Sequence, residues 1–211
     1  MQLSSLMDGI GILPVMCLKS EGELETFAEA LAKTPVKCIE ITMRHPFSYT
    51  AIPYIKKNYP QYTVAAGTVM DPDTMDRVLA IGADLCVAPG LDPALVAAAS
   101  ARGVPFIPGV ATPTEISHAM RLGLDTVKLF PAEAMGGVGV LKLYESAFAG
   151  MHFVPTGGIT AENYIAYLSQ KNVAAVGGSF MIPRAALASG DADAVAASVN
   201  HYVEEYRREV K

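Results

Sequence analysis

The chain has 211 residues and a formal net charge of −5, with 51% hydrophobic and 18% charged residues. Its length fits one domain over residues 1–211, near the lower size limit of an eight-stranded α/β barrel, and its acidic balance argues against nucleic acid as a partner. So few charges leave apolar surface for a second subunit to cover, which favours an oligomer.

The N-terminal segment carries no sign of export or membrane insertion. It has no cationic n-region, and its apolar run over residues 9–18 is too short to span a membrane. Cys17, Cys38 and Cys86 lie in apolar runs without metal or redox spacing, so we interpret them as core residues in a reducing compartment. The sequence therefore predicts a soluble, cytoplasmic protein without a membrane partner.

Eight short β-type runs recur along the chain, separated by segments rich in alanine and leucine that favour helices. The runs span residues 12–18, 36–43, 62–69, 83–90, 105–110, 126–132, 152–159 and 173–180. Helix starts are predicted at Asp71, Asp92, Thr112 and Thr160, and helix ends at Gly82, Gly103 and Gly123.

Alternating strands and helices predict a parallel sheet, and eight such units close most naturally into a (β/α)₈ TIM barrel. An open doubly wound sheet is the alternative, but no G-x-G-x-x-G follows the first strand. The segment after residue 190 carries apolar residues at helical spacing, which predicts a terminal helix that covers the barrel or meets a partner.

Side-chain alternation places two charged residues inside this barrel. In residues 36–44 the Ile and Met side chains suit the layer that faces the helices, which turns Glu40 and Arg44 inward. The same alternation in residues 126–132 turns Lys128 inward. A buried structural ion pair is one interpretation, although such pairs contribute little to stability. The other is catalytic: a desolvated lysine of lowered pKa attacks a ketone to form a Schiff base, with the carboxylate as general acid or base.

Two glycine-rich stretches follow the seventh and eighth runs: Thr156-Gly157-Gly158 and Gly177-Gly178-Ser179. Loops at these barrel positions often bind phosphate through backbone N–H groups, although each stretch alone also fits a tight turn. Backbone N–H groups near Thr68 and the guanidinium of Arg44 are candidates to hold a carboxylate, with a solvated rim arginine as the alternative for the latter. The four histidines lack metal-ligand spacing, so no metal or cofactor is expected.

Several blocks resemble the 2-keto-3-deoxy-6-phosphogluconate (KDPG) aldolase family, which includes 4-hydroxy-2-oxoglutarate (KHG) aldolases. They occur in order over nearly the whole chain: IEITMR (39–44), AAGTV (65–69), APG (88–90), PFIPGV (105–110), VKLFPAE (127–133), PTGGI (155–159) and GGSF (177–180). The resemblance implies a (β/α)₈ barrel, a homotrimer, and metal-free class I aldol cleavage of KDPG to pyruvate and glyceraldehyde 3-phosphate in the Entner–Doudoroff pathway.

The resemblance also implies a role for each matching residue. The Schiff-base lysine falls on Lys128 and the proton-transferring carboxylate on Glu40, with Arg44 and Thr68 at the pyruvate carboxylate. The pocket and phosphate contacts fall on Phe130, Pro89, Thr156, Gly157, Gly158, Gly178 and Ser179. Thr156 resembles the gluconate-specific form of the family. Some members carry an arginine near the end of strand one, where this chain has Met16-Cys17-Leu18-Lys19. Phosphate binding is therefore expected to depend on backbone N–H groups, with Lys19 as a candidate side chain.

Three other functions remain open on the sequence. An isomerase or epimerase would use Glu40 as the base for enolisation, with Lys128 as an electrostatic stabiliser. A metal-dependent aldolase would need carboxylates and histidines that the inward positions lack. A catalytically silent barrel would bind a phosphorylated metabolite without turnover.

Overall fold

The structure, a computed structural model, describes residues 10–210, so the expectations for residues 1–9 lie outside it. Nine strand segments occupy the eight predicted runs, two of them in the fifth run. They are β1 Ile12–Met16, β2 Cys38–Thr42, β3 Thr63–Gly67, β4 Leu85–Val87, β5 Phe106–Ile107, β6 Gly109–Val110, β7 Thr126–Leu129, β8 His152–Pro155 and β9 Val176–Gly178.

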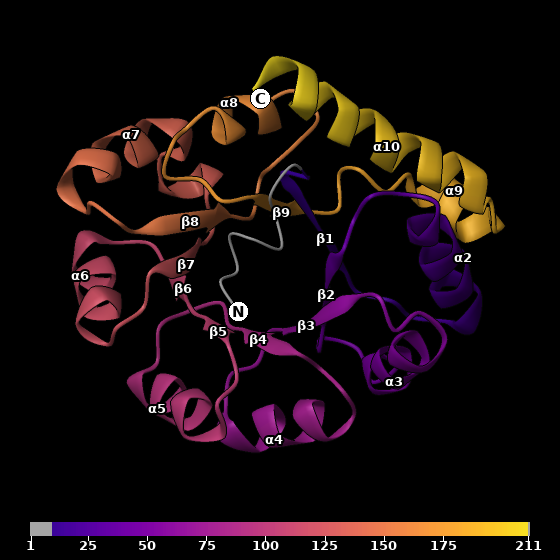
Figure 1. Ribbon diagram of the computed structural model, residues 1–211, viewed down its shortest axis with the longest axis horizontal. Coiled ribbons are helices and arrows are strands. Elements are labelled where there is room, and N and C mark those ends of the chain that lie inside the picture. The colour runs from indigo at the N-terminus through magenta and orange to yellow at the C-terminus, as the bar shows by residue number, and fades with distance from the viewer. Residues whose placement is uncertain (1–9, 211) are drawn as a thin grey trace.

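Helices separate most of the strands, as predicted. They are α2 Glu21–Ala32, α3 Ser48–Asn58, α4 Pro72–Ala80, α5 Pro93–Arg102, α6 Pro113–Arg121, α7 Gly137–Ala147, α8 Tyr164–Leu168, α9 Arg184–Ser189 and α10 Ala192–Glu209, with the 3₁₀ turn η1 at Glu133–Met135. Figure 1 shows these helices outside the strands, which lie around a common centre.

Three of the four predicted helix starts are confirmed. The side chains of Asp71, Asp92 and Thr112 each accept a hydrogen bond from a backbone N–H in the first turn that follows. The prediction for Thr160 is wrong. The Asn163 side chain accepts a hydrogen bond from the Thr160 N–H at 2.8 Å, which holds the intervening residues in a turn, and α8 begins only at Tyr164.

All strand pairs are parallel and form two sheets. The first has the order β5-β4-β3-β2-β1-β9 and the second the order β6-β7-β8. The break between β5 and β6 falls at Pro108, which has no N–H to donate, although its carbonyl accepts from the Lys128 N–H at 2.9 Å. The α/β class and the parallel pairing are confirmed, whereas closure into one eight-stranded barrel stays a prediction.

The apolar side chains divide into two clusters, one on each face of the strands. Ile39, Ile41, Val127 and Leu129 belong to the larger cluster between sheet and helices. Cys38 belongs to a small cluster at the centre, with Leu13, Ala65, Leu85, Val87, Ile107, Val154 and Ala175. The predicted inward and outward faces of β2 and β7 are therefore confirmed, and the small central cluster leaves room for inward polar groups.

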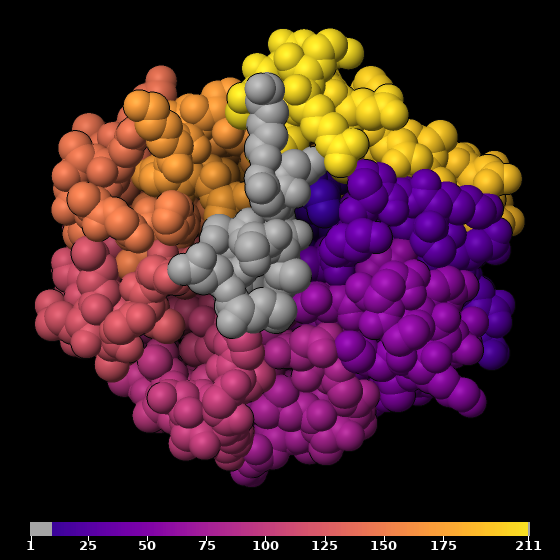
Figure 2. Space-filling view, viewed as in Figure 1, coloured from indigo at the N-terminus to yellow at the C-terminus, as the bar shows by residue number. Residues whose placement is uncertain are grey.

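The terminal helix α10 packs against α2 and brings the last part of the chain beside the first. Figure 2 shows the yellow C-terminal segment directly next to the indigo one. Val195, Val199 and Val203 lie on one face of this helix and are fully buried, which confirms its predicted apolar face. No helix within residues 10–210 is long and apolar enough to cross a membrane.

Candidate active site

A buried lysine–carboxylate pair lies at the centre of the molecule. Lys128 on β7 donates a hydrogen bond to Glu40 Oε1 on β2 at 3.3 Å, and the two residues are only 7% and 1% exposed. The Lys128 ammonium also lies 5.5 Å from the centroid of the Phe130 ring, a cation–π distance. The pair is therefore shielded from water and lies beside one aromatic ring. Burying two charged groups costs free energy, which an apolar core would avoid.

Gly67 at the end of β3 makes room for the Glu40 side chain. A Cβ atom at this position would lie 2.2 Å from Glu40 Oε1 and 2.9 Å from its Cδ. Because real Cβ atoms do not approach other atoms so closely, only glycine fits beside the carboxylate in this position. This role is not among those predicted from the sequence, although a glycine within a β-type run is a local signal for it.

The carboxyl end of β2 is fixed by hydrogen bonds around Thr42. The buried hydroxyl of Ser48 donates to the Thr42 carbonyl at 2.7 Å, and Arg44 Nε donates to Thr42 Oγ1 at 3.3 Å. The rest of the Arg44 guanidinium is exposed and lines two cavities described below. Arg44 is thus anchored by one nitrogen, and its other donors face the two cavities.

The two predicted glycine-rich stretches come together around one cavity of about 340 Å³. It is lined by Val15, Arg44, Phe130, Thr156, Gly157, Gly158, Ile159, Gly177, Gly178, Ser179 and Phe180. Thr156 and Gly177 form a parallel bridge, and a Cβ at Gly177 would lie 2.4 Å from Thr156 Oγ1. The close approach of these two segments is what places both glycine-rich loops on one cavity.

The Gly157–Gly158 loop is held from behind by the segment that contains Glu133. The Glu133 N–H donates to the Gly157 carbonyl at 3.1 Å, and Asn163 Nδ2 donates to the Gly158 carbonyl at 3.0 Å. Gly158 has a φ of 83°, and a Cβ there would lie 2.5 Å from Glu133 Cβ. Tyr167 also donates to Glu133 Oε1 at 2.5 Å, so the backing residue is itself fixed.

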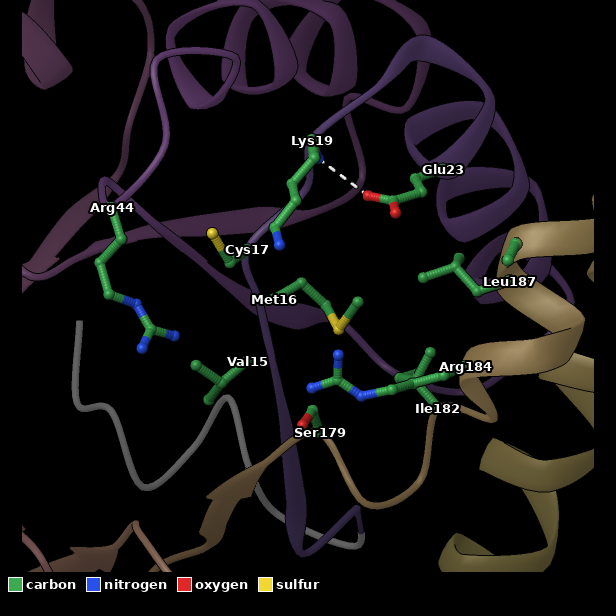
Figure 3. A pocket seen from close by; sticks show the side chains of 11 residues that line it. Val15, Met16, Cys17, Lys19, Glu23, Arg44, Ser179, Ile182, Arg184 and Leu187 are labelled. Atoms are coloured by element: carbon green, nitrogen blue, oxygen red, sulfur yellow. Dashed lines mark hydrogen bonds between the residues drawn. The ribbon is translucent and has the colours of Figure 1, made fainter.

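A second cavity of about 460 Å³ adjoins the first and shares Val15, Arg44 and Ser179 with it. Figure 3 shows the side chains of Lys19, Arg44 and Arg184 directed towards this cavity from three sides. Lys19 follows β1, and Arg184 begins α9. Arg184 is not among the residues predicted from the sequence, because nothing in its local sequence distinguishes it from a surface arginine.

Thr68 and Pro89 follow β3 and β4 and line neither cavity. Thr68 has a φ of 64°, the one positive φ of a non-glycine residue within residues 10–210. Such conformations are sparsely populated and collect at functional sites. The Pro89 carbonyl packs against Gly109, where a Cβ would lie 2.0 Å from it. Like the other candidate residues, both lie towards the carboxyl ends of parallel strands, where barrel enzymes place their active sites.

Together these residues provide the functional groups that nucleophilic attack on a ketone requires. Lys128 and Glu40 provide an amine next to a carboxylate, and an anchored guanidinium and two glycine-rich loops surround a cavity that neither of these two residues lines. The thiol of Cys38 is not a competing nucleophile, because burial, reinforced by the Glu40 charge, raises its pKa to about 12. Within the part of the chain that the structure describes, no group of three His, Cys, Asp or Glu side chains is placed to hold a metal ion.

Comparison with known proteins agrees with this chemistry. The family model for KDPG and KHG aldolase matches residues 3–198. The KHG/KDPG aldolase of Escherichia coli K12 is 38% identical over 193 residues, covering 92% of this chain and 91% of that protein. The 2-dehydro-3-deoxy-phosphogluconate aldolase of Dickeya dadantii is 39% identical over 186 residues, which cover 88% and 87% of the two chains.

A solved structure with the same fold holds a covalent intermediate. It is the KDPG aldolase of Legionella pneumophila with pyruvate captured as a carbinolamine, and it matches with a TM-score of 0.90 and 32% identity over 95% of this chain and 98% of that one. The matches extend over nearly the full length of each protein. The chain therefore belongs to the KDPG and KHG aldolase family.

Proposed function

We propose that the protein is a class I aldolase, a lyase that cleaves KDPG to pyruvate and glyceraldehyde 3-phosphate through a Schiff base on Lys128. The observation that carries this proposal is the buried contact of 3.3 Å between Lys128 and Glu40, next to cavities lined by Arg44 and the glycine-rich loops. The family membership and the carbinolamine in the Legionella relative support it.

In this mechanism Lys128 Nζ attacks C2 of the keto acid, and loss of water gives an iminium ion. Glu40, directly or through a water molecule, removes the proton of the C4 hydroxyl, and the electrons of the C3–C4 bond flow into the iminium. The aldehyde leaves, and the resulting enamine is protonated at C3. Hydrolysis then releases pyruvate and restores the amine, so the cycle needs no metal or other cofactor.

The remaining candidate residues bind and orient the substrate in this proposal. Arg44 and Thr68 hold the pyruvate carboxylate so that C2 faces the amine, a positioning effect. Phe130 lines the glycine-rich cavity, and Pro89, which lines neither cavity, is assigned to the pocket because of the family resemblance. The terminal phosphate is assigned to Thr156, Gly157, Gly158, Gly178 and Ser179, all five of which line one cavity. Cleavage of KHG to pyruvate and glyoxylate is a second activity of the same site.

The proposal extends to the architecture. We propose that residues 1–211 form one domain and that the two sheets close into a single (β/α)₈ barrel. In support, β5 and β6 are separated by Pro108 alone, and parallel bridges join the β8 and β9 regions at Phe153–Val173 and Thr156–Gly177. These links lie at the two places where the sheets would have to meet.

We further propose a homotrimer that works in the cytoplasm. Leu143 and Met70 are 69% and 62% exposed, and such apolar side chains are candidates for burial against another copy of the chain. Light scattering coupled to gel filtration measures the particle mass, and three times the mass of one chain is expected. A monomeric particle would remove this part of the proposal.

The proposed activity is tested by replacing the amine. The Lys128→Met variant should lose KDPG cleavage by at least about 10³-fold, because the covalent route is removed, while its circular dichroism spectrum stays unchanged. Lys171→Met, at an exposed position, is the matched control and should keep full activity. Cleavage that persists in Lys128→Met would end the Schiff-base proposal.

A further inference from the structure

Three cationic side chains line the cavity of about 460 Å³ without an acidic partner. Lys19, Arg44 and Arg184 approach it from the ends of β1 and β2 and from the start of α9 (Figure 3). Within residues 10–210, no carboxylate is in ion-pair contact with any of the three. Cations that converge on a hollow without a counterion raise the local concentration of anions.

Glu23 is the one carboxylate in the lining, and it does not neutralise this cluster. Its Oε2 accepts a hydrogen bond from the backbone N–H of Lys19 at 2.8 Å, beside the start of α2. Figure 3 shows this bond at the backbone of Lys19, whereas the side chain of Lys19 extends away from it towards the cavity. The cavity therefore keeps an excess of positive charge.

The neighbouring glycine-rich cavity has only one charged side chain in its lining. Apart from Arg44, which the proposed mechanism uses for the pyruvate carboxylate, its lining offers only uncharged donors: backbone N–H groups and the hydroxyls of Thr156 and Ser179. A phosphate monoester carries close to two negative charges at neutral pH. Uncharged donors can orient such a group, but a side-chain cation is needed to neutralise it.

Ser179 connects the two cavities, because it lines both of them. In Figure 3 the guanidinium of Arg184 lies next to Ser179. An anion bound at Ser179 is thus within reach of the planar fork of Arg184, which suits two phosphate oxygens at once.

We propose that Arg184, assisted by Lys19, binds the terminal phosphate of the substrate and sets the preference of this enzyme for phosphorylated over uncharged aldehydes. The inference rests on the proposed function and adds to it two cations that act together with the glycine-rich loops. Because both side chains are exposed at the mouth of the cavity, they contact the phosphate without being required for the fold.

The test compares Arg184→Gln and Lys19→Gln, singly and together, with Arg121→Gln. Arg121 is also exposed but lies on α6 outside both cavities, so its replacement makes the same change in net charge. Condensation of pyruvate is measured with D-glyceraldehyde 3-phosphate and with D-glyceraldehyde. Arg184→Gln should raise KM for the phosphorylated aldehyde about tenfold, and the double variant by more, since charge-assisted hydrogen bonds are lost.

The same variants should change kcat/KM for D-glyceraldehyde less than about twofold, because that aldehyde has no phosphate to bind. An unchanged KM for the phosphorylated aldehyde, or an equal loss with both aldehydes, would overturn the inference. Reduction with borohydride in the presence of pyruvate separates this failure from that of the proposed function. A pyruvate adduct on Lys128 in every variant leaves the Schiff base intact whatever the result for Arg184.

Discussion

Replacement of Gly67 by alanine tests the packing on which the catalytic pair depends. The new methyl group would lie 2.2 Å from Glu40 Oε1 and 2.9 Å from its Cγ and Cδ, so the carboxylate must move. Overpacking of this kind costs about 1–3 kcal/mol. For a domain of this size, that corresponds to a decrease in melting temperature of roughly 2–12 °C.

Displacement of Glu40 should affect turnover more than stability. The Lys128–Glu40 contact of 3.3 Å would be lost or lengthened, and loss of a general acid–base group lowers kcat by about 10²–10⁴-fold. Steady-state cleavage of KDPG measures kcat, and differential scanning calorimetry measures the stability. Gly139→Ala is the matched control, since a Cβ there meets no atom within 4 Å.

A second substitution identifies the cause of the effect. In a Glu40→Ala background the atoms that clash with the new methyl group are absent, so Gly67→Ala should then cost less than about 0.5 kcal/mol. Wild-type kcat in the single Gly67→Ala variant, or an equal loss of stability in both backgrounds, would refute the assignment of Gly67 as the residue that makes room for Glu40.

Three further predictions concern residues around the site. At pH 8, iodoacetamide should modify half-buried Cys17 in the native protein, but Cys38 and Cys86 only after unfolding in urea. Burial raises the pKa of each of these two thiols to about 12, which keeps them protonated. Peptide mapping that finds Cys38 or Cys86 alkylated in the native protein would contradict this prediction. Thr68→Gly should raise the free energy of unfolding, measured by calorimetry, by about 1 kcal/mol, because glycine adopts the φ of 64° without strain. KM for pyruvate should increase in the same variant. A loss of stability would show that the backbone at Thr68 is not strained. Asn163→Ala should raise KM for KDPG about fivefold with kcat unchanged, because the glycine loop loses its support, and an unaltered KM would argue against that role.

Alternation along the strands was sufficient to predict the pairing of Lys128 with Glu40. Each of the two residues lies in a β-type run and is flanked on both sides by branched apolar residues. These neighbours suit the face that packs against the helices, so the charged side chain between them is assigned to the inward face. The position of the strands was predictable for the same reason. The break at Pro108 was not deduced, although a proline without an N–H within the fifth run was a local signal for it.

Arg184 could not be predicted, because its role depends on where α9 meets the end of β1. The arginine is 165 positions away from Lys19 in the sequence, and only the three-dimensional fold directs both side chains to one cavity. The start of α8 was mispredicted for a more local reason. Thr160 and Asn163 are both suitable N-cap residues, and the hydrogen bond that Asn163 accepts from the Thr160 N–H decides between them.

The central claim is that Lys128 forms a covalent imine with pyruvate. The most direct test is intact-mass spectrometry after incubation with pyruvate and borohydride, followed by peptide mapping. We expect a single pyruvate-derived adduct on Lys128, and none in Lys128→Met. An adduct at another lysine, or no adduct although pyruvate binds, would contradict the claim.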